Sequence, residues 1–225
     1  MPPCWQPYRG ESPKSAKPAH NLPGRMMAVP HPPSPAQNQA AGILRGAMIA
    51  CEDGDVAIEA IKIGDIVNTL SDGPQVVRWV GSAALSSPVV QIMAGALGKN
   101  SPAQDLLVAP AQRMVLSGWQ AEVLFGESRV LVAAEALVNG KNISLIKQPS
   151  GLEHFHILFD KHETIAANGT TSESFYPSKL AINSLPAEAR QALAKQVPEL
   201  GSLDRSHPFD LVHPAISAAE AALLR

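Results

Sequence analysis

Short apolar runs separated by turn-forming residues fill the chain from about residue 42 to residue 180. Runs rich in Val, Ile and Leu that end at Gly, Pro, Asp or Asn are typical of short β-strands joined by tight turns. The turn Ser71-Asp72-Gly73 lies between two such runs and predicts a hairpin. The pattern therefore predicts an all-β fold of many short strands. The runs expected to form strands are Ile66–Val67, Val76–Val80, Val89–Met93, Leu106–Val108, Met114–Leu116, Val130–Val132 and Phe155–Ile165.

Two short segments inside this region are read differently. Ala57–Ile63 fits either a brief strand or a turn of helix, and Val132–Val138 fits a short helical turn. Beyond the strands, Ala189, Leu193 and Val197 recur at helical spacing, which predicts a helix over 186–197 with one face packed on the β body. Ser184 is expected to cap this helix. A last helix is expected over about 215–224.

The first 40 residues differ in composition from the rest of the chain. Ten of the twenty prolines lie there, and few large apolar residues accompany them. Because proline lacks an amide donor and fixes one backbone angle, neither a helix nor a sheet ladder can run through this segment. We expect three parts: a disordered or polyproline-like arm (1–40), a β domain (41–182) and a C-terminal helical extension (183–225).

Several motifs follow one another in a recognisable order in the β region. They are Gly46–Gly54, Ile58–Thr69, Asp72-Gly73 leading to Val77–Gly81, Asp105–Met114, His156–Thr164 and Ser172–Pro177. In this order they resemble the Hedgehog/intein (Hint) family of self-processing domains, in its stand-alone bacterial branch. The resemblance covers about residues 42–180 and implies a compact, horseshoe-like β fold.

The resemblance also shows which chemical groups this chain lacks. Similar proteins begin with Cys-x-x-x-Gly-Thr, whose cysteine attacks the preceding carbonyl, and a later Thr/Ser-x-x-His supplies a hydroxyl and an acid/base. Here the first motif reads Gly42-Ile-Leu-Arg-Gly46-Ala47, and the second begins at Ala109 and ends at Gln112. Glycine has no nucleophile, and an amide does not titrate near neutral pH. The resemblance therefore implies a domain without autocatalytic cleavage that acts as a scaffold or binding module.

Two alternatives stay open at this point. The first is self-cleavage by a non-standard nucleophile, either Cys51 or a serine. Cys51 has no basic neighbour in sequence that would lower its pKa, and we expect it to be a small buried apolar residue. Cys4 lies in the Pro-rich arm, so we expect no structural disulfide between the two cysteines.

The second alternative is a small metal-binding β protein. In one continuous strand, His154, His156, Asp160 and His162 would lie on the same face, and imidazole and carboxylate groups are zinc ligands. Against this, four positions along one strand span too far for a single ion. We expect instead that His162 ties the last hairpin to the body with Asp160 as its partner. The sequence predicts neither a metal nor a cofactor.

The remaining motif residues are expected to shape the fold. Glycines at turns accept a positive backbone angle, aspartates cap turns, and Arg78 beside Trp79 is expected to make a half-buried polar contact. The residues assigned this structural role are Gly46, Gly64, Asp65, Gly73, Arg78, Trp79, Asp160, His162 and Glu163.

Composition limits the partners and the location. The chain has 225 residues and a formal net charge of −2, with no basic stripe, so we expect no nucleic-acid partner. No apolar run reaches the length of a membrane span, and the N-terminus lacks the apolar core of a signal peptide. We expect a monomeric cytoplasmic protein with an unidentified protein partner, and we leave export through a C-terminal signal open.

Overall fold

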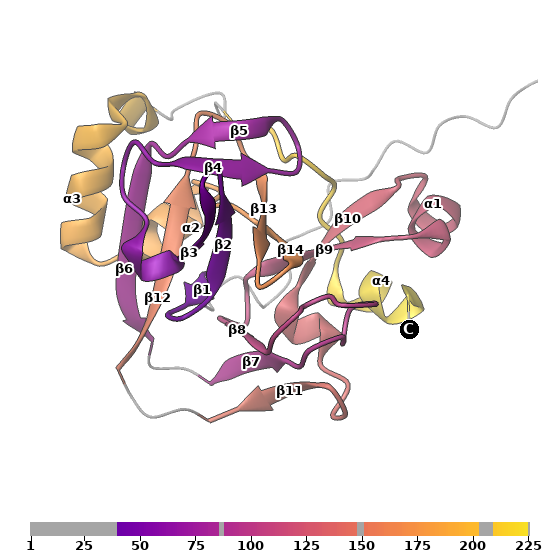
Figure 1. Ribbon diagram of the computed structural model, residues 1–225. Coiled ribbons are helices and arrows are strands. Elements are labelled where there is room, and N and C mark those ends of the chain that lie inside the picture. The colour runs from indigo at the N-terminus through magenta and orange to yellow at the C-terminus, as the bar shows by residue number, and fades with distance from the viewer. Residues whose placement is uncertain (1–39, 86–87, 148–150, 203–208, 225) are drawn as a thin grey trace, which may run out of the picture. The chain divides into compact units, whose positions relative to one another are not determined.

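Two antiparallel sheets contain all the named strands of the described residues (Figure 1). The computed structural model describes residues 40–85, 88–147, 151–202 and 209–224, and these residues all lie in the unit Pro33–Arg225. The prediction of an all-β fold of many short strands is confirmed. The expected disordered arm lies outside the described residues, apart from its last residue, Ala40.

The first sheet has six strands, and its centre is the short strand that opens the domain. Their order is β11 (Ile143–Ile146), β7 (Val89–Ile92), β8 (Leu106–Val108), β1 (Ile43–Leu44), β12 (Leu152–Leu158) and β6 (Trp79–Leu85). In β1, Ile43 pairs with Phe155 on one side and with Val108 on the other. The start of the domain is therefore held between two strands that are distant in sequence.

The second sheet has eight strands. The path runs β10 (Arg129–Ala133), β9 (Arg113–Ser117), β14 (Thr170–Glu173), β13 (Thr164–Ala167), β2 (Met48–Cys51), β4 (Ile66–Thr69) and β5 (Gly73–Val76), with β3 (Gly54–Ala57) paired to β2. The expected hairpin at Ser71-Asp72-Gly73 joins β4 to β5. Beyond β10, Leu131 also forms a parallel bridge with Ala215 from the C-terminal segment.

Two runs that we expected to be single strands are divided between the sheets, so this part of the prediction was wrong. In the run Val76–Val80, β5 ends at Val76 and β6 begins at Trp79. In Phe155–Ile165, β12 ends at Leu158 and β13 begins at Thr164. The two crossings lie next to each other, because the Arg78 amide donates to the carbonyl of Leu158. Polar residues lie at both crossings, namely Arg78 at the first and Asp160–Glu163 at the second.

The main core joins both sheets. Ile43 and Phe155 from the first sheet belong to the same buried cluster as Ile49, Met114 and Ile165 from the second. Burial of this apolar surface is the main stabilising contribution to such a fold. The site described below lies at the edge of this core, where β1 begins.

Helices are short and lie mostly after the last strand. They are α1 (Trp119–Phe125), α2 (Lys179–Ser184), α3 (Ala187–Gln196) and α4 (Ala218–Ala221), with 3-10 turns η2 (Ile58–Ala60), η3 (Ala134–Leu137), η4 (Pro198–Ser202) and η5 (Ala222–Leu224). The sequence pattern did not predict α1, which lies between β9 and β10 in Figure 1. No helix among the described residues is long and apolar enough to cross a membrane.

The helix expected over 186–197 is α3, and it packs as predicted. Leu193 and Val197 are buried in a cluster with Trp79, Leu158 and Phe175, and Figure 1 shows α3 beside β6. The expected cap was wrong. Ser184 ends α2 and donates to the Ala181 carbonyl, while Pro186 takes the N-cap position of α3.

Candidate functional site

The two positions that the sequence motifs single out, residues 42 and 112, are in contact. The Gly42 amide donates to Gln112 Oε1 at 2.8 Å, although 70 residues separate them. The Ala109 amide donates to the Gly42 carbonyl at 2.9 Å, and the Ala111 amide donates to the Ala40 carbonyl at 3.1 Å. Residues 40–42 therefore extend the pairing of β1 with β8 into the turn that leads to β9.

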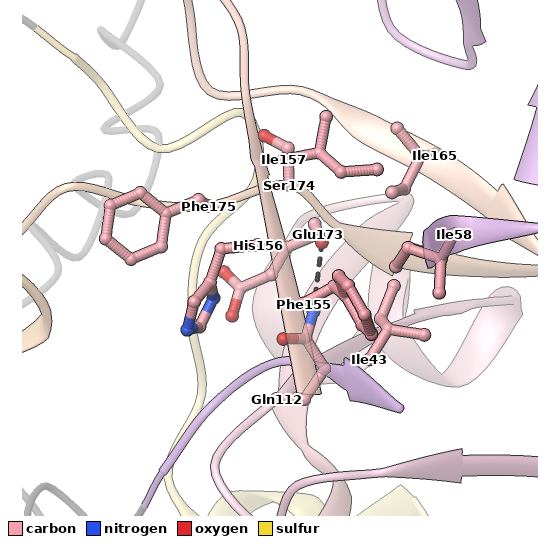
Figure 2. Close-up of a pocket in the computed structure, with 10 residues that line it drawn as sticks. All are labelled: Ile43, Ile58, Gln112, Phe155, His156, Ile157, Ile165, Glu173, Ser174 and Phe175. Atoms are coloured by element: carbon pink, nitrogen blue, oxygen red, sulfur yellow. Dashed lines mark hydrogen bonds between the residues drawn. The ribbon is translucent and has the colours of Figure 1, made fainter. Parts of the chain in front are cut away.

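The orientation of the Gln112 amide follows from its other partners. Its Nε2 donates to Ser172 Oγ and to the Glu173 carbonyl, each at 2.9 Å, and Figure 2 shows the contact with Glu173. A carbonyl oxygen can only accept, so Nε2 must face Glu173 and Oε1 must face Gly42. Gln112 thus accepts a hydrogen bond from the nitrogen of peptide 41–42. It has no proton to give to that nitrogen.

Position 42 has no room for a side chain. Gly42 has φ +125, a conformation that favours glycine, and a Cβ placed there would lie 2.6 Å from Cδ2 of His154 and 3.1 Å from the carbonyl oxygen of Phe155. Ala109 is fully buried, and its methyl group packs in a small cluster with Leu44. Neither position carries a thiol or a hydroxyl, and residue 42 has no space for a side chain.

The nearby imidazoles are neutral. Burial lowers the pKa of His156 to about 3, with the neighbouring His154 as a second cause. Burial also lowers the pKa of His154. A backbone hydrogen bond with Ala83 acts in the opposite direction and raises this pKa. The two rings meet edge to face with their centroids 5.2 Å apart, and His156 also contacts the ring of Phe175 at 4.8 Å. These contacts are those of packed aromatic side chains.

A small cavity lies beside Gln112 (Figure 2). Figure 2 shows Ile43, Ile58 and Ile165 on one side of it, and His156 and Phe175 on the other. Its volume is about 10 Å³, which is room for one water molecule at most. This cavity cannot hold a substrate or a cofactor.

The expected partner of His162 was wrong. Asp160 lies in the exposed turn after β12 and pairs with Arg78, because the strand ends at Leu158. His162 Nδ1 instead accepts from the Val212 amide at 3.2 Å, and its Nε2 lies 3.3 Å from Glu173 Oε2 without a well-aligned hydrogen bond.

Glu173 is held from a second side by Arg113. The Arg113 amide and guanidinium donate to the two carboxylate oxygens, each at 3.1 Å. Glu173 therefore connects β14 to β9, while His162 connects this carboxylate to the C-terminal segment.

The histidines do not form a metal centre in the part of the chain that the structure describes. His154 and His156 lie in β12 of the first sheet, whereas His162 lies beyond its end. No three His, Cys, Asp or Glu side chains of the described residues are grouped to hold an ion. The break after Leu158 removes the single strand face on which the metal hypothesis depended.

Cys51 is a buried residue of β2 in the second sheet. Burial raises the pKa of its thiol, and the carboxylates of Asp65 and Asp55 raise it further. A thiol with a raised pKa stays protonated at neutral pH and is a poor nucleophile. Cys4 lies outside the described residues.

The residues expected to shape the fold lie at turns and in buried contacts. Asp65 accepts from the Lys62 amide at 2.8 Å, and Trp79 is buried against Phe175. Arg78, which pairs with Asp160, also contacts Glu199 at 3.2 Å. The backbone of Glu163 exchanges hydrogen bonds with Ser174, whose amide donates at 2.8 Å and whose hydroxyl accepts at 2.9 Å. Gly46, Gly64 and Gly73 have positive φ values.

The sequence pattern missed Ser172 and Glu173 as partners of Gln112. They are part of the Ser172–Pro177 motif, but about 60 residues separate them from Gln112. No local signal connects positions so far apart. Only the pairing of β14 with β9, which places Ser172 opposite Met114, brings them together.

Comparison with known proteins found a matching family and several similar solved structures. A model of the Hint domain family matches residues 41–179. The solution structure of a bacterial intein-like domain from Clostridium thermocellum is 13% identical to this chain in sequence, with a TM-score of 0.40. The match covers 60% of this chain and 99% of the intein-like domain. A DnaB intein from Synechocystis sp. PCC 6803 is 11% identical to this chain, with a TM-score of 0.39, and the match covers 60% of this chain and 99% of the intein. A search of curated proteins found no significant match.

Proposed function

The chain belongs to the Hint domain family, and we propose that it keeps the fold of that family without cleaving itself. It acts as a scaffold or protein-binding module to which the preceding residues 1–41 stay attached. The contact between Gly42 and Gln112 carries this proposal. The peptide nitrogen at 41–42 meets an acceptor where cleavage would need a proton donor.

The nucleophile is also missing from this site. Gly42 has no side chain, and the geometry around it leaves no space for one. Ala109 offers no hydroxyl, and its amide is used by the Gly42 carbonyl. Three separate requirements of an acyl shift, the nucleophile, the acid and the hydroxyl, are absent together.

Neither replacement nucleophile is supported by its surroundings. Cys51 is buried in the second sheet with a raised pKa. Ser172 is near Gln112, but its hydroxyl already donates to the Arg113 carbonyl at 3.2 Å and accepts from Gln112. Ser174 Oγ accepts from the Glu163 amide. Among the described residues, these two hydroxyls form hydrogen bonds with amide and carbonyl groups, which do not act as a base.

Intact mass spectrometry of the freshly purified full-length chain tests the proposal, with and without an added thiol. We expect one species of 23.8 kDa that persists for days in thiol. Cys51→Ala is the matched control, because it removes the described thiol without touching residues 42, 109 or 112. A pair of fragments with a junction before residue 42 or 51 would overturn the proposal. Fragments that disappear in Cys51→Ala would identify that thiol as the nucleophile.

A further inference from the structure

One side chain occupies the space next to residue 42. His154 comes from β12, which pairs with β1 in the first sheet, and the backbone register sets Leu44 opposite His154. A Cβ on residue 42 would lie 2.6 Å from Cδ2 and 3.3 Å from Cβ of this histidine. A separation under 3 Å is shorter than any ordinary carbon contact, so one of the two groups would have to move.

His154 cannot move away easily. Its side chain is 5% exposed and lies against His156, whose ring is itself held by Phe175. The backbone of His154 is fixed on both sides, by β1 and by Ala83 of β6. Interiors packed in this way accept an extra methyl group only by distortion.

Hydrogen bonds satisfy the imidazole of His154 only in part, through the backbone of Ala83. Its Nδ1 is buried and has no hydrogen-bond partner among the described atoms. An unpaired buried nitrogen is unfavourable. His154 also fills the space directly beside residue 42, the position that aligns with the family nucleophile.

We propose that His154 fills the place of the nucleophile's side chain, so that histidine at 154 and glycine at 42 form an interdependent pair that excludes any side chain from position 42. This inference rests on the proposed loss of self-cleavage and adds a residue that maintains it. Replacing Gly42 alone would then not rebuild a nucleophile, because His154 would still occupy its space.

A double-mutant cycle in thermal unfolding tests the pair, using Gly42→Ala, His154→Ala and the double variant of the full-length chain. The positive φ of residue 42 strains Gly42→Ala in both backgrounds, so that contribution cancels in the cycle. We expect Gly42→Ala to lower Tm by about 5 °C more when His154 is present than when it is alanine. Equal losses in the two backgrounds would overturn the inference.

Two controls separate this contact from a general loss of packing. Gly46 also has a positive φ, but a Cβ there would meet nothing within 4 Å, so Gly46→Ala should lower Tm equally with and without His154. His156→Ala removes the neighbouring buried ring. It should reduce the Tm loss caused by Gly42→Ala by less than His154→Ala does. Equal rescue by both histidine variants would overturn the specific role of His154.

A second variant covers the case in which Gly42→Ala does not fold. Soluble yield is then compared between Gly42→Ser and Gly42→Ser/His154→Ala, since serine carries a hydroxyl of the nucleophilic kind. Folded protein recovered only in the double variant supports the pair, and no recovery overturns it. The cycle measures stability alone, so self-cleavage of the wild-type chain would overturn the proposed function and leave this test unaffected.

Discussion

At the scale of single residues, the site around peptide 41–42 consists of uncharged amide, hydroxyl and carbonyl groups that form hydrogen bonds with one another. Gln112 is 4% exposed and links Gly42, Ser172 and Glu173 through one amide. An amide can accept and donate at once, which a carboxylate or a methyl group cannot do. Gln112 therefore joins the residue that precedes β1 to the end of β14.

We expect Gln112→Ala to lower the free energy of unfolding by about 3 kcal/mol, because it leaves the buried Gly42 amide and Glu173 carbonyl without their partner. Urea denaturation at neutral pH measures this change. Gln120→Ala is the matched control, since Gln120 is exposed in α1. A loss for Gln112→Ala no larger than that of the control would show that this network does not stabilise the fold.

The buried His156 makes stability depend on pH. Its pKa is about 3 in the folded chain, compared with 6.5 for an ordinary histidine. The unfolded chain therefore takes up a proton that the folded chain does not accept. The free energy of unfolding falls as the pH drops from about 6.5 toward 3, and this stabilisation is fully present only above that range.

Replacing this imidazole should weaken the pH dependence. We expect His156→Phe to show a smaller fall in unfolding free energy than wild type between pH 7 and 4, measured by urea denaturation at several pH values. Some slope will remain, because burial also lowers the pKa of His154. An unchanged slope, or an NMR titration of His156 near pH 6.5, would contradict a neutral buried ring.

At the scale of elements, the crossings between the two sheets are fixed by packing on both sides. Trp79 and Leu158, the residues next to the two crossings, are buried in the cluster that α3 covers. The ion pair between Arg78 and Asp160 lies outside this cluster and is partly exposed, so it contributes little by itself. The helix, rather than the ion pair, therefore stabilises this corner.

Leu193 is the central contact of α3. We expect Leu193→Ala to lower the free energy of unfolding by about 3 kcal/mol, since its side chain is 2% exposed and truncation leaves a cavity. Chemical denaturation is the measurement. Leu180→Ala in α2 is the control, because that side chain is 52% exposed. Equal effects of the two substitutions would mean that α3 does not stabilise the β body.

At the scale of the whole molecule, the C-terminal segment completes the second sheet. The Leu131 amide donates to the Pro214 carbonyl at 2.8 Å, and the Ile216 amide donates to the Leu131 carbonyl at 3.0 Å. Without these contacts β10 would be an open sheet edge, which is a common site of aggregation. Val212 extends the attachment to His162.

Two truncated chains distinguish the role of residues 214–216, which cover the β10 edge, from the role of α4. We expect a chain that ends at residue 208 to have a lower Tm and to scatter light on standing, because the β10 edge is uncovered. A chain that ends at residue 217 keeps the contacts of Leu131 with 214–216 and loses α4. This longer chain should have a lower Tm than wild type, but its solution should not scatter light on standing. Equal scattering from both chains would show that α4, and not the 214–216 ladder, prevents association.

The sequence by itself determined most kinds of element and the family to which the chain belongs. Strands and the α3 helix were predictable because hydrophobic spacing is a local property that each segment carries. Residues 42 and 112 carry no thiol, hydroxyl or imidazole, because glycine and glutamine lack these groups in any environment. Local spacing did not predict α1, a helix of seven residues in which Trp119 and Val123 are exposed and Ala121 is buried.

Only the tertiary structure decided how these parts meet. It divided the segments 76–80 and 155–165 between the two sheets, at positions where polar residues interrupt the apolar pattern. It paired His162 with Val212 and Asp160 with Arg78, which lie 50 and 82 residues apart. It also placed His154 against Gly42, a contact that depends on the register of β12 beside β1. Such contacts depend on strand order, which residue spacing along the chain does not specify.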